Sequence, residues 1–328
     1  MTKRTFVALC GALALVACKG DDGENPDTDT DTTGCGVTVS NQFPSDGATG
    51  VYYRTSLEWD FSEADTTATV TLSAGGTDVA GSGEWVDSLY IWTPSSPLDP
   101  STTYDVNLTW CGGSSDTTFT TSAVGAVVPD ADLTDAAYVL DIASGRFVQP
   151  AGVGALLQQQ LTVDILIGVV DIAGTTLTLQ GALGEEGVTP AAQDLCTESI
   201  DFPSANFSEN PYFEVGPQNT TLEVQGISIT IDDLFVSGAF SPDGGEISGA
   251  VLAGSIDTRP LVDLVSPGGG PEAVCELVQT FGIACEACAG GGDFCLSLLV
   301  DQIAATEVAG LTVVTRTAAD VAQDPNCQ

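Results

Sequence analysis

The 328-residue sequence contains no histidine, one methionine and only seven lysine or arginine residues. Without histidine, the chain has no imidazole base, no Ser-His-Asp or Cys-His nucleophile and no histidine-ligated zinc. GxSxG, SxxK, P-loop and GxGxxG motifs are also absent from the sequence. We therefore expect a protein that is not an enzyme and has no cofactor. An acid-pair hydrolase remains an alternative, because the chain has 45 aspartate and glutamate residues.

Positive charge is scarce, and the formal net charge is −38 at pH 7. Such a surface repels phosphate backbones, so nucleic-acid binding is excluded. Only 16% of the residues are charged and 43% are hydrophobic, which favours folded cores over disorder. Threonine, serine, glycine, valine and aspartate dominate the composition, which is typical of secreted β-rich proteins.

The N-terminus has the pattern of a secretory signal peptide. Two positive residues precede an apolar run at 5–17, which is too short to span a bilayer core of about 30 Å. The run leads into LVAC at 15–18, which resembles the lipobox of bacterial lipoproteins. In that family the peptide is cut before the cysteine, which then becomes lipidated. The resemblance implies that residues 1–17 are removed and that Cys18 anchors the protein to a membrane; an ordinary secretory signal is the alternative.

Residues 18–35 comprise this cysteine and an acidic, Asp/Thr-rich segment that contains almost no apolar side chain. We expect it to be an extended, solvated tether. Asp27, Asp29 and Asp31 match the start of an EF-hand loop, but glycine is missing at the sixth position and glutamate at the twelfth. They predict at most weak divalent-cation binding. By analogy with lipoprotein sorting, Lys19 favours the outer membrane, at its periplasmic or its cell-surface face.

Residues 36–123 alternate between apolar and polar with period two and are interrupted by turn residues, which predicts a β-sandwich. The expected strands lie at 37–40, 56–62, 68–73, 88–94, 102–110 and 117–122. All four tryptophans belong to this region: Trp59, Trp85, Trp92 and Trp110. We expect them to pack in the core rather than to form a platform for stacking sugars.

Several short motifs in this region, in their order along the chain, resemble the SbsA-type bacterial Ig-like domains of cell-surface proteins. They are PSDGATGV at 44–51, FS at 61–62, LDP at 98–100 with TY at 103–104, and TFTT at 118–121. The resemblance covers about a quarter of the chain. It implies a spacer or adhesive module without catalytic residues. Tyr104 is similar to the tyrosine that pins a strand crossover in such sandwiches.

Residues 128–328 carry no family resemblance, but their pattern is also rich in strands. Strands are expected at 137–142, 164–172 and 175–183, a short helix at 150–161, and a hairpin over 234–258 around a Pro-Asp-Gly-Gly turn at 242–245. In 221–231 the apolar residues change phase at Gly226, which indicates a β-bulge or a tight bend. Glycines at 238, 249 and 254 indicate a curved antiparallel sheet, either a barrel or a sandwich.

A cysteine-rich helical insert is expected at about 270–306. Pro271 is placed to begin a first helix that ends at Gly282, and 293–305 is expected to form a second helix. The segment 310–318 is then expected to return to strand.

Eight cysteines remain after Cys10 in the signal peptide and the lipidated Cys18 are set aside: Cys35, Cys111, Cys196, Cys275, Cys285, Cys288, Cys295 and Cys327. The sequence CEACAGGGDFC at 285–295 lacks the histidine or second CxxC of a zinc knuckle, and it does not follow a strand as a thioredoxin-like motif does. A four-thiolate metal site is disfavoured in an oxidising compartment. We therefore expect disulfides. One would join Cys35 to Cys111, and the other six cysteines allow fifteen connectivities.

The sequence thus predicts a mainly β protein, in which an Ig-like sandwich precedes a larger curved antiparallel sheet with a small disulfide-rich helical insert. We expect a non-enzymatic outer-membrane lipoprotein that displays a binding domain on an Ig-like spacer and has a protein or glycan partner. A carrier of a hydrophobic ligand is an alternative. Its cavity would be lined by residues such as Leu166, Val169, Ile229 and Ile231.

Overall fold

The computed structural model describes residues 35–142, 145–150, 163–224 and 227–327. Cys18, the three aspartates of the tether and all but the first residue of the helix expected at 150–161 lie outside these residues. Within them, no helix is both long enough and apolar enough to cross a membrane. Residues 36–328 form one compact unit.

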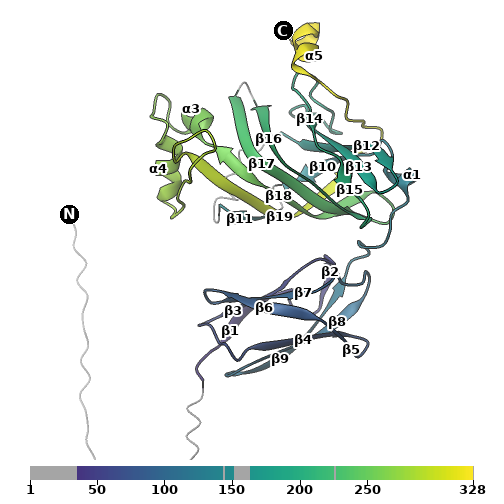
Figure 1. Ribbon diagram of the computed structural model, residues 1–328, viewed down its shortest axis with the longest axis vertical. Helices are drawn as coiled ribbons and strands as arrows, with labels where there is room; N and C mark the ends of the chain where they lie inside the picture. The colour runs from purple at the N-terminus through teal and green to yellow at the C-terminus, as the bar shows by residue number, and fades with distance from the viewer. Residues whose placement is uncertain (1–34, 143–144, 151–162, 225–226, 328) are drawn as a thin grey trace, which may run out of the picture. The chain divides into compact units, whose positions relative to one another are not determined.

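The first strands form the two sheets of an Ig-like sandwich (Figure 1). One sheet has the order β1 (Val39–Phe43), β3 (Leu57–Phe61), β7 (Leu89–Pro94), β6 (Gly81–Val86). The other has the order β2 (Ala48–Val51), β9 (Gly113–Thr121), β8 (Thr103–Trp110), β4 (Thr69–Ala74), β5 (Thr77–Val79). The predicted sandwich is confirmed. The sequence pattern misses β6, because most of its residues are exposed and no apolar alternation marks it.

The alternation along β3 places its apolar residues in the sandwich core. Leu57, Trp59 and Phe61 are at most 4% exposed, and the residues between them face away. Trp85 and Trp110 are half-buried, with their rings edge-on to Phe61 at 5.0 Å and 6.2 Å between centroids. The tryptophans of this domain therefore contribute to its core.

Tyr104 lies where a tyrosine corner is expected. Its ring is buried and stacks on Phe119 with centroids 5.4 Å apart. Its hydroxyl accepts a hydrogen bond from the backbone N–H of Asp99 at 2.7 Å. This bond ties the start of β8 to the preceding loop.

The rest of the chain builds one ten-stranded antiparallel sheet (Figure 1). Its main path is β14 (Ile200–Asp201), β13 (Thr176–Leu183), β12 (Ile165–Ala173), β10 (Ala137–Asp141), β19 (Cys295–Glu307), β18 (Glu246–Asp257), β17 (Ile227–Phe240), β16 (Tyr212–Val224). In addition, β11 (Arg146–Gln149) pairs with β19, and β15 (Ala205–Asn206) pairs with β13.

This sheet curls around a single apolar core. Leu179 from β13, near one end of the strand order, lies in the same buried cluster as Phe213 from β16 at the other end. Tyr138 and Phe240 join the same cluster from strands between them. The predicted curved antiparallel sheet is thus confirmed, as one sheet that folds over its own core.

β-Bulges with left-handed residues accompany the curvature. The pairing register shifts in β16 near Gly216, in β17 near Asp233, in β18 near Gly249 and in β19 near Gln302. Each of these four residues has a φ between 53° and 94°. An extra residue at a bulge bends its strand and increases the local twist. The repeated bulges in neighbouring strands explain why a sheet of this width closes over a core.

The helix expected at 293–305 is wrong, because this segment is β19, between β10 and β18. Val300 and Ile303 are both fully buried although they are three residues apart. The bulge near Gln302 inserts one residue between them and returns both side chains to the same face. A bulged strand therefore imitates the spacing of a helix. The helical part of the insert is confined to α3 (Val262–Val265) and α4 (Ala273–Gln279), and the insert ends before Cys295.

The strand expected at 310–318 is also absent. Residues 311–317 belong to no strand ladder, and α5 (Ala318–Gln323) follows them. Of the two alternatives for the phase change in 221–231, the tight bend is confirmed and the bulge is wrong, since Val224 pairs with Ile227 across the β16–β17 hairpin. The hairpin expected around 242–245 is confirmed by the pairing of β17 with β18. The other short elements are α1 (Asp130–Leu133), η2 (Arg259–Leu261) and η3 (Pro325–Cys327).

Candidate functional site

The cysteines of CEACAGGGDFC form two local disulfides. Cys275 of α4 is bonded to Cys285, and Cys288 is bonded to Cys295 at the start of β19. Cys288 and Cys295 are buried. All four sulfurs that were candidates for a metal site are therefore used in disulfides. The two bridges tie the short helical insert to the end of a central strand.

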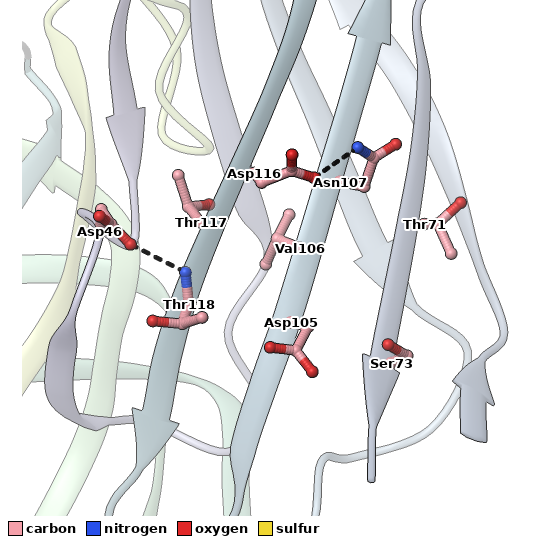
Figure 2. A pocket seen from close by; sticks show the side chains of 9 residues that line it. All are labelled: Asp46, Thr71, Ser73, Asp105, Val106, Asn107, Asp116, Thr117 and Thr118. Carbon is pink, nitrogen blue, oxygen red and sulfur yellow. Dashed lines mark hydrogen bonds between the residues drawn. The ribbon is translucent and has the colours of Figure 1, made fainter. Parts of the chain in front are cut away.

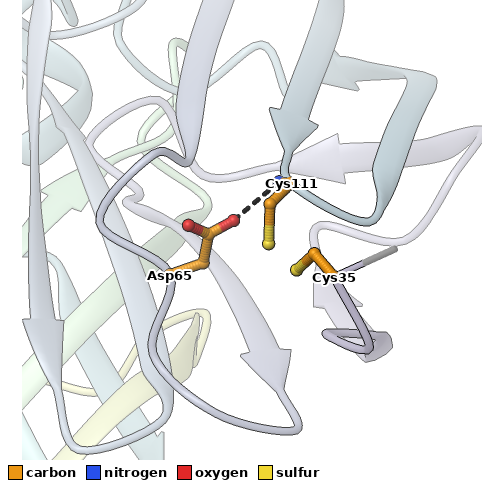
Figure 3. A group of neighbouring side chains, drawn as sticks. All are labelled: Cys35, Asp65 and Cys111. Carbon is orange, nitrogen blue, oxygen red and sulfur yellow. Dashed lines mark hydrogen bonds between the residues drawn. The ribbon is translucent and has the colours of Figure 1, made fainter. Parts of the chain in front are cut away.

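Cys35 and Cys111 are both disulfide-bonded, so neither offers a thiolate to a metal. Figure 3 shows Asp65 beside them. The Asp65 carboxylate accepts hydrogen bonds from the backbone N–H of Cys111 at 2.7 Å and from the N–H and hydroxyl of Thr67 at 2.9 Å and 2.7 Å. These bonds stabilise the charged form and lower the pKa of Asp65. The carboxylate has a structural role in holding two loops.

A shallow polar hollow of about 270 Å³ lies on the sheet formed by β4, β8 and β9 (Figure 2). It is lined by Asp46, Thr71, Ser73, Asp105, Val106, Asn107, Asp116, Thr117 and Thr118. Asp46 accepts the backbone N–H of Thr118 at 2.9 Å, and Asp116 accepts the side-chain amide of Asn107 at 2.7 Å. The hollow offers hydrogen-bonding groups to hydroxyl-rich ligands. Two of its carboxylates already hold neighbouring groups, so it gives the acid-pair hydrolase little support.

The four residues named for a carrier cavity do not line one space. Val169 and Ile231 belong to the main core, and Ile229 packs against that core. Leu166 lies in a separate cluster on the other face of β12. Another hollow, of about 170 Å³, lies at the ends of β10 and β12 and is smaller than typical ligand pockets.

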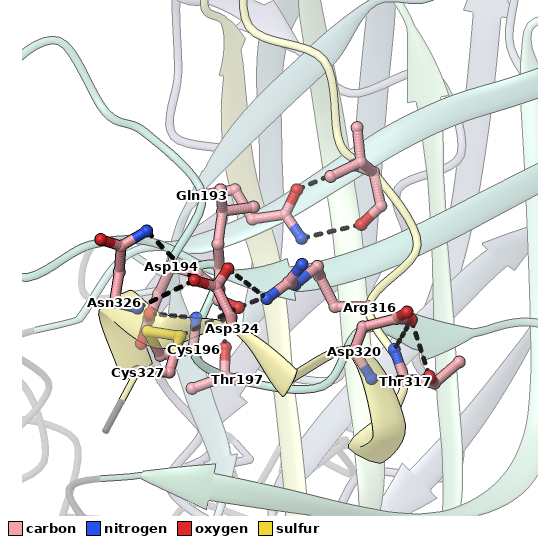
Figure 4. A network of polar contacts seen from close by, with 12 residues as sticks. Gln193, Asp194, Cys196, Thr197, Arg316, Thr317, Asp320, Asp324, Asn326 and Cys327 are labelled. Carbon is pink, nitrogen blue, oxygen red and sulfur yellow. Dashed lines mark hydrogen bonds and ion pairs between the residues drawn. A yellow bond between two sulfur atoms is a disulfide. The ribbon is translucent and has the colours of Figure 1, made fainter. Parts of the chain in front are cut away.

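The C-terminal residues return to the outer face of the curled sheet, where Cys327 is bonded to Cys196 (Figure 4). Arg316 forms an ion pair with Asp324 at 2.9 Å and donates to the backbone carbonyl of Leu195 at 2.8 Å. We call residues 311–316 the C-terminal strap.

Side chains hold the backbone of the strap as a neighbouring strand would. The Gln193 side chain accepts the Val314 N–H at 2.8 Å and donates to the Val314 carbonyl at 2.9 Å (Figure 4). Ser199 accepts the Arg316 N–H at 2.9 Å through its hydroxyl, and its own N–H donates to the Arg316 carbonyl at 2.9 Å. The extended backbone of the strap is thus bound at alternate residues.

Apolar contacts hold the other end of the strap. Val313 is 8% exposed and packs with Ala137, Leu166 and Ala182 in a small cluster, with Leu311 against it. A Cβ added to Gly168 would lie 2.6 Å from the Cβ of Val313. The bare backbone of β12 at this glycine therefore makes room for Val313.

The sequence reasoning missed Gln180 and Gln193, which are 3% and 8% exposed. The side-chain amide of Gln180 donates a hydrogen bond to the Thr315 hydroxyl at 3.0 Å. No feature of the sequence distinguishes these two glutamines from surface residues. Gly168 did carry a signal, since a glycine within a buried strand often marks a close approach of another segment.

Two of the four described arginines join residues of the Ig-like domain to residues of the curled sheet. Arg146 of β11 pairs with Glu58 of β3 at 3.0 Å and with Asp301 of β19 at 2.7 Å. Arg54 pairs with Glu209, and its guanidinium lies 3.8 Å from the centroid of the Tyr212 ring. The hydrogen bonds that Arg146 donates to Asp301 and Glu58 raise the pKa of Arg146, which stays charged.

Comparisons with known proteins support the first domain. A family model described as a bacterial Ig-like domain matches residues 31–137, and the chain contains such a domain. A search of curated proteins found no match. L,D-transpeptidase 3 from Mycobacterium tuberculosis is similar, with 24% identity over 29% of this chain and 42% of that one, and a TM-score of 0.21. The alignment thus spans about two fifths of that enzyme.

Two further solved structures show similar scores. L,D-transpeptidase 1 from Mycobacterium tuberculosis aligns at 13% identity over 60% of this chain and 74% of that one, with a TM-score of 0.23. The N-terminal part of the bacterial S-layer protein SbsC aligns at 11% identity over 47% of this chain and 42% of that one, with a TM-score of 0.22. At TM-scores this low, the alignments do not establish a shared fold for the whole chain.

Proposed function

We propose that the protein is a non-enzymatic, lipid-anchored protein of the outer membrane. In this proposal the lipid on Cys18 holds the protein at the membrane, and the tether and the Ig-like domain carry the curled-sheet domain away from it. The observation that carries the proposal is the LVAC sequence at 15–18, followed by an acidic tether and an Ig-like domain. Two or three acyl chains give stable anchoring, since each buried methylene contributes about 0.8 kcal/mol.

The absence of histidine and the use of the insert cysteines in disulfides support a binding role over catalysis. The partner in this proposal is a protein or a glycan. The hollow on the Ig-like domain presents carboxylate, amide and hydroxyl groups that suit the hydroxyls of a glycan. The carrier alternative is not favoured, because Leu166 and Val169 lie in different apolar clusters.

The anchoring is tested by expressing the full chain and a Cys18→Ser variant in a bacterium with an outer membrane and feeding an alkyne fatty acid. We expect label only on the wild-type chain, with its mature N-terminus at Cys18. We also expect the variant to leave the membrane fraction. An unlabelled wild-type chain whose first residue follows another cleavage site would contradict the proposal.

The membrane face is tested by adding protease to intact cells and to cells with a permeabilised outer membrane. Loss of the protein from intact cells would show surface display, and loss only after permeabilisation would place it in the periplasm. Intact protein in both samples, with controls cleaved as expected, would contradict an exposed domain on a solvated tether.

A further inference from the structure

We propose that the outer face of β12 and β13 is a binding site for an extended peptide, which the C-terminal strap occupies as an intramolecular ligand. In this proposal the Cys196–Cys327 disulfide latches the strap in place. When an external dithiol reduces the latch to two cysteine thiols and is itself oxidised to a disulfide, the site accepts a peptide of the same pattern from another protein. This inference is independent of how the protein is anchored. We define the outer docking face as Ala137, Leu166, Gly168, Gln180, Ala182, Gln193 and Ser199.

The hydrogen bonds that hold the strap come from side chains and one backbone N–H, not from a strand ladder. Residues 311–317 pair with no strand of the described chain. Instead, Gln193 binds both main-chain groups of Val314, and Ser199 binds both main-chain groups of Arg316. Recognition of main-chain groups at alternate residues is how proteins bind extended peptides of varied sequence.

The docking face beneath the strap has a row in which two small residues leave room for a side chain of the strap. In the pairing of β10 with β12 and of β12 with β13, Ala137, Gly168 and Gln180 are direct neighbours in one row. The three atoms nearest to a Cβ added at Gly168 all belong to Val313. Val313 therefore occupies the space directly above this glycine. The row thus accommodates one apolar side chain, that of Val313, above Gly168. At its end, the Gln180 amide donates a hydrogen bond to the hydroxyl of Thr315, two residues after Val313.

The sequence of the strap has the alternation expected of an extended peptide that is bound along one side. Leu311 and Val313 face the docking face, while Thr312 and Val314 are exposed, as in an extended peptide with one side bound. Arg316 closes the pattern by donating a hydrogen bond to the Leu195 carbonyl, while its ion pair with Asp324 lies within the C-terminal segment itself. The ligand class is therefore an extended segment with two alternate apolar residues followed by a basic residue three positions later.

The latch explains why the site is filled in the folded chain. The disulfide joins residues 131 positions apart. In the chain-entropy model, closing a loop of this size stabilises the folded state because it restricts the unfolded chain. A tethered strap also has an effective concentration in the millimolar range, which a free peptide must exceed. A test in trans must therefore remove the latch and displace the strap.

The test uses the full chain with Cys196→Ser, Cys327→Ser and Val313→Asp, which opens the latch and places a charge above Gly168. The probe is a labelled peptide GLTVVTRTA, the sequence of residues 310–318. We expect it to bind this opened chain at least tenfold more tightly than the wild-type chain, by fluorescence anisotropy. A peptide with aspartate in place of the Val313 equivalent should not bind.

A matched variant adds Gly168→Val to the opened chain, which places a branched side chain where Val313 sits in the wild-type chain. We expect it to abolish peptide binding and to leave the circular dichroism spectrum unchanged. Equal binding to the chain with Gly168→Val and to the opened chain would overturn the proposal. So would an absence of binding to an opened chain that keeps its native spectrum.

Hydrogen exchange keeps the proposal testable if the triple variant does not fold. In the chain with only Cys196→Ser and Cys327→Ser, we expect protection of 311–316 to fall at least tenfold while β12 and β13 stay protected. The control is Cys275→Ser with Cys285→Ser, which should leave the strap protected. Loss of protection in β12 and β13 together with the strap would show an integral part of the core rather than a bound ligand, and would overturn the proposal.

Discussion

At the scale of single residues, buried polar groups decide local structure through the partners that they hold. Asp65 accepts three hydrogen bonds from the chain around Cys111 and Thr67, and these bonds lower its pKa. A carboxyl group whose pKa is lower in the folded state stabilises the protein above its unfolded pKa of about 3.9. That contribution is lost as the pH falls through the folded-state pKa.

For Asp65→Asn we therefore expect a lower melting temperature at pH 7 and a smaller difference from the wild type as the pH falls below about 4. An amide offers one acceptor oxygen where the carboxylate offers two. Melting temperatures measured between pH 7 and pH 2.5 check this, with the exposed Asp60→Asn as the control. A difference that is the same at every pH would show that the charge of Asp65 does not matter.

Tyr104→Phe removes the acceptor of the Asp99 N–H and keeps the buried ring. We expect a loss of about 1–3 kcal/mol in the free energy of unfolding, because a part-buried N–H is left without its partner. Urea denaturation measures this loss. An unchanged midpoint would mean that the hydroxyl does not pin the crossover.

At the scale of elements, the bulges of β16 to β19 determine both the curvature of the sheet and the apolar spacing along its strands. Gly216 and Gly249 adopt their left-handed φ without a side-chain penalty. Gln302 carries a side chain at a φ of 55° and is exposed. Left-handed backbone costs a residue with a Cβ about 1–2 kcal/mol.

Gln302→Gly is expected to stabilise the protein by up to about 1 kcal/mol, because relief of the left-handed strain exceeds the entropy that glycine loses on folding. Gln302→Ala keeps the Cβ and should give no such gain. Chemical denaturation of both variants measures the difference. A destabilised glycine variant beside a neutral alanine variant would contradict the strain at this bulge.

At the scale of the whole molecule, positive charge is so scarce that each arginine among the described residues has an assignable role. Arg54 and Arg146 join the Ig-like domain to the curled sheet, Arg316 holds the strap, and Arg259 pairs locally with Asp257. In a chain with a net charge of −38, these pairs also relieve repulsion between carboxylates.

Arg146→Gln leaves Glu58 and Asp301 without their shared cation. We expect it to lower the free energy of unfolding by about 1 kcal/mol at low salt, since the guanidinium is 45% exposed and the pairs are partly screened. In 1 M NaCl, where the Debye length is about 3 Å, the difference should shrink. Urea denaturation at both salt concentrations checks this. Arg259→Gln, whose pair spans only two residues, should have a smaller effect.

The sequence by itself determined what depends on local pattern and on residue types. The alternation of β3 predicts the sandwich, the Pro-Asp-Gly-Gly turn at 242–245 predicts its hairpin, and the cysteines of the insert predict disulfides. The first two features follow from neighbours along the chain. The disulfides follow from the absence of histidine, which excludes a zinc knuckle at the insert cysteines.

Only the tertiary structure decided the features that depend on residues distant in sequence. Strand β19 imitates a helix because a bulge places Val300 and Ile303 on one face, and a bulge is defined by the partner strand. The strap looks like a strand, but most of its partners are side chains, such as that of Gln193, more than a hundred residues away. Disulfide pairing likewise follows from distance in space. Local periodicity carries no information on which distant group satisfies an extended backbone.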